Sequence, residues 1–247
     1  MMNRRHCLGA LGALTVAGCA TRLPSLPAGL EAGKQKPFVI EDSPASPIGL
    51  MWVSLPAGYA EAREPWPLLI FLHGSGERGS DLNKVLMHGP PKHAAAGQAY
   101  PMVVVSPQLG EGRRWEPAEL HALLGELQAR FKVDPKRSYC TGLSLGGHGT
   151  WNWASTYPGD LAAVAPVCGY GDPAQVAANM KRIPVRAYHG DQDKAVPIEK
   201  QQACVDALRA AGGDVSFTVY PGVGHDSWVQ AYEDPGLVPW LLSKKLA

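Results

Sequence analysis

The sequence has few charged residues, few cysteines and no cluster of cations. Charged residues make up 18% of the 247 positions, and 23 Lys and Arg against 22 Asp and Glu leave a net charge of +1. Binding to nucleic acid needs clustered cations, so we expect no nucleic-acid partner. The five cysteines show no metal-ligand spacing and no glycine-rich loop has a phosphate-binding pattern, so neither a metal nor a cofactor is expected. The 45% hydrophobic content suits one globular domain.

Long hydrophobic runs are also missing, apart from a short one at the N-terminus. Residues 1–18 predict a signal peptide, with Arg4 and Arg5 before the apolar segment 8–18, which is too short to span a membrane. The sequence VAGC, ending at Cys19, resembles a bacterial lipobox, which implies lipidation of Cys19 and a lipoprotein at the periplasmic face of a bacterial membrane. The alternative is an ordinary cleaved signal, with Cys19 incidental, that leaves a soluble periplasmic or secreted protein. Residues 4–8 also loosely resemble a twin-arginine export signal.

The rest of the chain predicts one α/β domain. Residues 19–37 are rich in Pro and Gly without apolar periodicity, which predicts a tether, and residues 38–247 form the domain. The apolar runs 68–72 and 102–105 are typical of strands buried on both faces of a parallel sheet. Strand and helix patterns alternate, so we expect a doubly wound, mostly parallel sheet with helices on both faces. Further strands are expected at 38–40, 48–55, 138–141, 162–167, 185–189 and 215–220, and helices from Pro117 and at 145–157, 197–211 and 227–244.

Three cysteines fall inside this domain. Cys140 and Cys168 lie in apolar, strand-like runs, and Cys204 lies in a predicted helix. A bridge between Cys140 and Cys168 is conceivable in an oxidising compartment, but buried free thiols fit the apolar surroundings better.

Residues 142–146 have the pattern G-x-S-x-G at the junction of a predicted strand and a predicted helix. In that setting the turn holds the serine in a strained backbone conformation and presents its hydroxyl above the sheet. Ser144 is therefore the candidate nucleophile, and the Leu145 N–H is placed to donate to a developing oxyanion. The alternative is a glycine-rich turn with an incidental serine.

The loop 73–76, with the sequence HGSG, directly follows the apolar strand 68–72. In proteins with such a strained serine turn, called a nucleophile elbow, the loop in this position supplies the second oxyanion donor from a backbone N–H. We assign the Ser75 amide, with the Gly76 amide as the alternative. His73 is expected to fix the loop by hydrogen bonding rather than to take part in chemistry.

A serine nucleophile needs a general base, which a third group must orient. In proteins whose nucleophilic serine lies in a G-x-S-x-G turn, the acid and then the histidine follow the serine along the chain. His225 lies in a glycine-rich loop after the last strand, whereas His189 ends a strand before the acid candidates. The segment 189–197 resembles an H-G-x-x-D-x-x-V-P arrangement seen across many α/β hydrolases, and this resemblance favours Asp193 as the acid over Asp191, which is expected to bind turn amides.

Substrate contacts are harder to assign. His148 follows the nucleophile by one helical turn and could border the pocket or simply pack. Trp115 and Trp228 lie on loops that are expected to face the site, with core packing as the equal alternative. Asp226 directly follows His225 and is expected to cap the next helix.

Three motifs in order, at 67–79, 141–151 and 220–228, resemble the α/β-hydrolase superfamily. The similarity covers most of 66–242. It is to the bacterial "predicted peptidase" and esterase group, near polyhydroxybutyrate-depolymerase-like, feruloyl-esterase-like and dienelactone-hydrolase-like proteins. This resemblance implies the α/β-hydrolase fold and a triad of Ser144, Asp193 and His225. The chain departs from the dienelactone hydrolases in one respect, because their nucleophile is Cys.

We therefore expect a serine esterase that works through an acyl-enzyme on a small-molecule ester. The short segment between residues 169 and 185 leaves little room for a large lid, which favours short-chain or aryl esters. A serine peptidase would share the same catalytic groups, and a non-catalytic surface lipoprotein is the third reading. Contact with a membrane is expected only through the lipid on Cys19.

Overall fold

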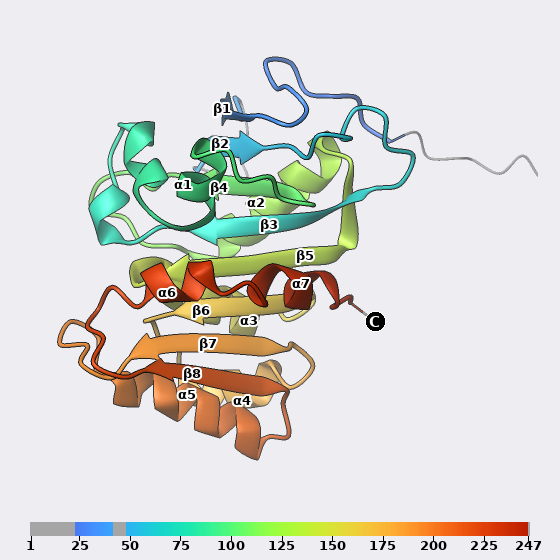
Figure 1. Cartoon of the computed structure of the whole chain (residues 1–247). Coiled ribbons are helices and arrows are strands. Elements are labelled where there is room, and N and C mark those ends of the chain that lie inside the picture. The colour runs from blue at the N-terminus through green and yellow to red at the C-terminus, as the bar shows by residue number, and fades with distance from the viewer. Residues whose placement is uncertain (1–22, 42–47, 247) are drawn as a thin grey trace, which may run out of the picture.

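The computed structural model describes residues 23–41 and 48–246 and contains one eight-stranded sheet (Figure 1). The strand order is β1-β2-β4-β3-β5-β6-β7-β8. β2 runs antiparallel to both of its neighbours, β1 and β4, and every other pair is parallel. The strands are β1 Gln35–Val39, β2 Leu50–Ser54, β3 Trp66–Leu72, β4 Val103–Pro107, β5 Val133–Leu143, β6 Ala163–Val167, β7 Val185–Gly190 and β8 Val215–Tyr220.

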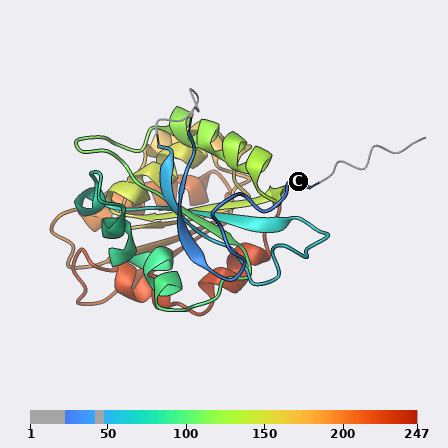
Figure 2. The same cartoon turned by 90° about the horizontal axis from the view of Figure 1, so that it is seen from above.

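Helices cover both faces of the sheet, as the view along its plane shows (Figure 2). One face carries α2 Pro117–Arg130, α3 Leu145–Thr156, α4 Pro173–Asn179 and α5 Ile198–Ala210. The other carries α1 Gly89–Ala95, α6 Trp228–Glu233 and α7 Leu237–Leu242. Two short 3-10 helices, η1 Ser75–Glu77 and η2 Leu82–Met87, follow β3. The sequence patterns did not predict η1, η2, α1 or α4.

The strand order and the two helical layers confirm the predicted α/β-hydrolase fold. Between β6 and β7, where a large lid would insert, the structure has only the short helix α4. Because parallel strands end at one edge, the loops after β3, β5, β7 and β8 gather there, and that edge is where such folds place catalytic groups.

The central strands show why the sheet is buried on both faces. In β3, Leu68 and Ile70 pack into the core beneath α2 and α3, whereas Leu69 and Phe71 pack into the core beneath α6 and α7. Successive side chains of a strand point to opposite faces, so an unbroken apolar run fills both cores at once.

The predicted helix at 227–244 is wrong in one respect, because the segment forms two helices rather than one. α6 ends at Glu233 and α7 begins at Leu237. Between them Asp234 accepts a hydrogen bond from the Gly236 N–H (2.8 Å) and Pro235 supplies no N–H, so the helical ladder cannot continue.

The predicted tether at 19–37 is also too long. Leu30 is 5% exposed and belongs to the core, and β1 already begins at Gln35, so this part of the segment belongs to the domain. Residues 1–18 and Cys19 lie outside the described residues. Across 23–41 and 48–246, none of the helices has the length and apolarity that a membrane crossing requires.

The described cysteines Cys140, Cys168 and Cys204 are free and buried, as the apolar surroundings predicted. Burial raises the pKa of the Cys140 thiol to about 12, so this side chain is a neutral core residue.

Candidate active site

The turn after β5 and the loops after β7 and β8 bring three predicted side chains into one hydrogen-bonded line. Ser144 Oγ lies 2.9 Å from Nε2 of His225, and Nδ1 of His225 lies 2.7 Å from Oδ2 of Asp193. The chain separates these residues by dozens of positions, so the parallel sheet alone makes them neighbours. With Nδ1 protonated and donating to Asp193, Nε2 is free to accept the hydroxyl proton of Ser144.

The turn that carries Ser144 is strained in the way the motif predicts. Ser144 has φ 53° and ψ −113°, a conformation that non-glycine residues rarely adopt. A Cβ on Gly146 would lie 1.8 Å from the carbonyl oxygen of Leu72, and one on Gly142 would lie 2.5 Å from that of Gly146. Only glycine therefore lets α3 start this close to β3 and β5.

The two acid candidates, Asp193 and Asp191, have different hydrogen-bond partners in the structure. Oδ1 of Asp193 accepts the N–H groups of Ala195 and Val196, both at 2.9 Å, which leaves Oδ2 for His225. Burial alone would raise the pKa of the Asp193 carboxyl, but the hydrogen bonds from His225 and the two amides outweigh it and lower that pKa. Asp191 instead accepts the Gly222 N–H at 2.7 Å, the turn role that was expected of it.

His73 fixes the loop after β3. Its Nε2 accepts the Leu109 N–H (3.0 Å), which requires the proton on Nδ1, and Nδ1 then donates to the Gly74 carbonyl (2.6 Å). Burial lowers the pKa of His73 to about 4. The ring therefore stays neutral and holds the loop, as predicted, while the donor roles of the Ser75 amide in η1 and the Leu145 amide in α3 remain predictions.

Because the folded protein holds His73 neutral, acid should weaken the fold. The stabilising contribution of His73 is complete above the ordinary pKa of 6.5 and is lost as the pH falls from 6.5 to about 4. This interval corresponds to about 3 kcal/mol. Urea unfolding of the wild type and of His73→Asn should therefore show a stability difference that shrinks by this amount between pH 7 and pH 4. Comparing the two proteins cancels the other titrating groups, and a difference that stayed constant with pH would contradict the neutral buried ring.

Trp115 does not line the site, which corrects its prediction as a substrate contact. Its side chain is 4% exposed, its Nε1 donates to the His73 carbonyl (3.0 Å), and its ring packs edge-on against the His73 ring. A Cβ on Gly149 of α3 would lie 2.7 Å from the Cβ of Trp115. The Trp115 side chain thus packs between α3 and the loop after β3, and its contacts with His73 stabilise that loop.

Trp228 and His148 are half-buried residues around the triad. The Trp228 ring packs edge-on at 5.3 Å from the His225 ring and lies 5.2 Å from that of His88, which the sequence patterns did not single out. His148 packs edge-on against Tyr170 at 4.3 Å, and its Nδ1 lies 2.8 Å from the Tyr170 carbonyl oxygen. Burial lowers the pKa of His148, so the group is neutral near pH 7.

Asp226 does not have the capping role that was expected of it. The N-cap of α6 is Ser227, and within the described residues no side-chain hydrogen bond caps this helix. Ser227 has φ −54° and ψ −17°, so the backbone is already helical there and α6 begins without the extended residue that a side-chain cap requires.

Cys168 is a close neighbour of the triad that the sequence patterns did not reveal. It directly follows β6 and has φ 40°, and its Sγ, an Asp193 oxygen and a His225 nitrogen all lie within 4.8 Å of one another. Thiolate, carboxylate and imidazole are zinc ligands, but burial raises the pKa of this thiol to about 12 and His225 and Asp193 already bind each other. The arrangement therefore favours the triad over a metal centre.

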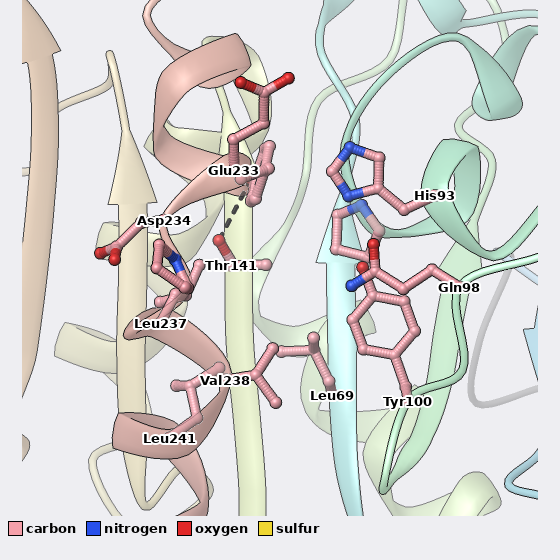
Figure 3. A pocket seen from close by; sticks show the side chains of 13 residues that line it. Leu69, His93, Gln98, Tyr100, Thr141, Glu233, Asp234, Leu237, Val238 and Leu241 are labelled. Atoms are coloured by element: carbon pink, nitrogen blue, oxygen red, sulfur yellow. Dashed lines mark hydrogen bonds between the residues drawn. The ribbon is translucent and has the colours of Figure 1, made fainter. Parts of the chain in front are cut away.

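A cavity of about 410 Å³ lies away from the triad (Figure 3). His93, Gln98 and Tyr100 line one side, α7 lines the other, and Thr141 of β5 lies at the floor, where it binds the Tyr232 hydroxyl (3.1 Å). Residues of α1, α6 and α7 line the cavity, so it lies on the face of the sheet that these helices cover.

Residues 108–234, just over half of the chain, match the dienelactone hydrolase family, and this segment includes all three aligned side chains. The chain belongs to this family. The match confirms the resemblance that the sequence motifs indicated.

Curated relatives of this dienelactone hydrolase family member carry ester-hydrolase names. A Methylorubrum extorquens protein named carboxymethylenebutenolidase is 32% identical over 120 residues, which cover 44% of this chain and 40% of that protein. Carboxylesterase SOBER1 of Arabidopsis thaliana is 31% identical over 43% of this chain and 48% of its own length. The chain thus spans less than half the length of these relatives.

Solved structures agree on the fold over a larger share of the chain. A thermostable esterase superposes with a TM-score of 0.74 and 27% identity, covering 86% of this chain and 64% of the other. A ferulic acid esterase superposes with a TM-score of 0.60 and 20% identity, over 84% of this chain and 99% of the other.

Proposed function

We propose that the protein is a carboxylic-ester hydrolase in which Ser144 is the nucleophile, His225 the general base and Asp193 the orienting acid. The observation that carries this proposal is the continuous hydrogen-bonded line from Ser144 Oγ through the imidazole to the carboxylate. The strained backbone at Ser144 supports it, because strain of this kind persists where a function requires it. Family membership and the ester-hydrolase names of the relatives support the reaction class.

In this mechanism Ser144 Oγ attacks the ester carbonyl carbon while Nε2 of His225 takes the hydroxyl proton. Asp193 keeps the proton of His225 on Nδ1 and stabilises the imidazolium. The developing oxyanion binds the amides of Leu145 and Ser75, each contributing roughly 3–4 kcal/mol in the transition state. His225 then protonates the leaving alkoxide, and a water activated by the same imidazole hydrolyses the acyl-enzyme.

The substrates we propose are short-chain or aryl esters. The connection between β6 and β7 contains only the short helix α4, so no lid inserted at that position has to move before a soluble substrate binds. The half-buried Trp228 ring beside His225 offers an aromatic wall for an acyl or aryl group. The name of the relative carboxylesterase SOBER1 supports an ester substrate.

A matched substrate panel tests the proposal. Acetyl, butyryl, octanoyl and feruloyl esters should be hydrolysed, with rates that fall from butyryl to octanoyl and do not rise above the micelle point. The amide of the fastest acyl group should be cleaved far more slowly, since its leaving group is much poorer. Cleavage of the amide at the rate of the ester would identify a peptidase instead.

We propose further that the chain is exported and anchored by lipid on Cys19. The support is the short apolar segment before VAGC in the sequence. Expression in a Gram-negative host should place the wild type in the membrane fraction and label it with a fatty-acid probe, while Cys19→Ser should be unlabelled. Equal labelling of both proteins would refute the anchor.

A further inference from the structure

His189, the last residue before Gly190 at the end of β7, lies behind the catalytic line and is completely buried. Its Nε2 lies 3.2 Å from Oδ2 of Asp193, the oxygen that also accepts the hydrogen bond from His225. The carboxylate of Asp193 thus lies between two imidazoles. The mechanism above uses only one of them.

The surroundings of His189 consist of hydrogen-bond acceptors. Nδ1 lies 2.5 Å from Oε1 of Gln201, and Nε2 lies 2.9 Å from the Val196 carbonyl oxygen in addition to its contact with Asp193. A neutral imidazole has one N–H and one lone pair, so one of its nitrogens would face an oxygen without a proton between them. In a fully buried site such an unsatisfied contact is costly.

The amide of Gln201 cannot relieve this conflict by turning over. Its Nε2 donates to the carbonyl oxygen of Pro166 at 3.2 Å, and Gln201 is itself fully buried. With the amide reversed, Oε1 would face the Pro166 carbonyl oxygen with no proton between the two oxygens. With a proton on each nitrogen, Nδ1 donates to Oε1 of Gln201, and Nε2 donates to the Val196 carbonyl oxygen while its positive charge faces Oδ2 of Asp193.

We propose that His189 is a protonated positioning residue, a buried imidazolium that holds the Asp193 carboxylate from the β7 side while His225 binds the same oxygen. This inference rests on the proposed role of Asp193 as the catalytic acid. The cation offsets the burial of the carboxylate and fixes its orientation, and as a second positive charge it makes protonation of His225 less favourable.

Other titratable groups near the two rings do not supply this charge. Cys168, at the end of β6, and His148, on α3, are neutral near pH 7 because burial raises the pKa of the thiol to about 12 and lowers that of the imidazole. The acidic neighbours are Asp193 itself and Asp226, which follows His225 in the loop. None of these four residues changes when position 189 is substituted, so a shifted pH profile would report the charge at 189.

The protonation state is tested first without any activity measurement. In histidine-¹⁵N-labelled Ser144→Ala protein, the ring of His189 should show two protonated nitrogens from pH 5 to pH 8, assigned by their loss in the double variant with His189→Gln. A single protonated nitrogen at pH 7 would overturn the proposal. This result does not depend on whether the protein hydrolyses esters.

Two variants test the positioning role. His189→Gln places a neutral amide near the site of Nε2, whereas the shorter His189→Asn reaches only the site of Nδ1. For His189→Gln we expect the acidic limb of the kcat/KM profile to move about one pH unit upward, because His225 keeps its proton to higher pH once the neighbouring charge is gone. For His189→Asn we expect kcat to fall about ten- to a hundredfold with KM unchanged, because Asp193 loses a contact.

A purely structural role would lower the thermal stability of both variants and leave the acidic limb in place, and that outcome would refute the inference. Circular dichroism at the assay temperature confirms that each variant is folded before its profile is compared. If the wild type hydrolyses none of the esters, the proposed function fails, while the NMR experiment still decides the state of His189.

Discussion

Replacing Ser144 by alanine should lower kcat for a butyryl ester by about 10⁴ to 10⁶-fold and leave the protein folded. The loss is large because the hydroxyl is the group that forms the new bond, so the remaining histidine and carboxylate have nothing to activate. Residual hydrolysis would come from the oxyanion amides acting on bound substrate and water.

A fluorophosphonate probe gives the same test a covalent readout. The wild type should gain one label on the peptide that contains Ser144, and Ser144→Ala should gain none. Ser216→Ala is a matched control, because Ser216 is exposed on β8 at a distance from the loops of the site. Full activity or labelling of Ser144→Ala would mean that another nucleophile is at work.

Replacing Asp193 by asparagine should lower kcat by about four orders of magnitude. The amides of Ala195 and Val196 donate to one oxygen of this side chain, so an asparagine would direct its NH₂ group at Nδ1 of His225. Nδ1 would then have to accept, which moves the ring proton to Nε2 and removes the lone pair that Ser144 needs.

Asp191→Asn is the matched comparison, two residues away in the same loop. An asparagine there keeps the carbonyl oxygen that accepts the Gly222 N–H, so kcat should stay near that of the wild type. Steady-state kinetics of the two variants on one ester therefore separate the acid from the turn residue. A large loss in Asp191→Asn with little in Asp193→Asn would reverse the assignment.

The sequence predicted well those parts of the structure that depend on local pattern. The apolar runs of β3 and β4 identify a sheet buried on both faces, and the glycines around Ser144 identify the elbow because no other residue fits there. The chain order of nucleophile, acid and base then placed His225 and Asp193, and their contacts bring them into line.

Features that depend on contacts between distant segments were beyond such patterns. Trp115 lies in a loop, as the sequence indicates, but packing against α3 and His73 buries its side chain. Cys168 directly follows β6 and His189 is the penultimate residue of β7, and only the pairing of these neighbouring strands brings both beside Asp193. The break between α6 and α7 was visible as Pro235, but the helical spacing of Leu237, Trp240 and Leu241 suggested a helix over the whole segment.

The glycine at 146 has a consequence for how this scaffold can diverge. The steric demand of the turn falls on the two glycines that flank the nucleophile, whereas Oγ of Ser144 faces the His225 ring. Exchanging oxygen for sulfur at position 144 would therefore leave the frame intact, whereas a single methyl group two residues later would collide with β3. A fold built in this way can trade one reactive element for another over evolutionary time while its architecture stays fixed.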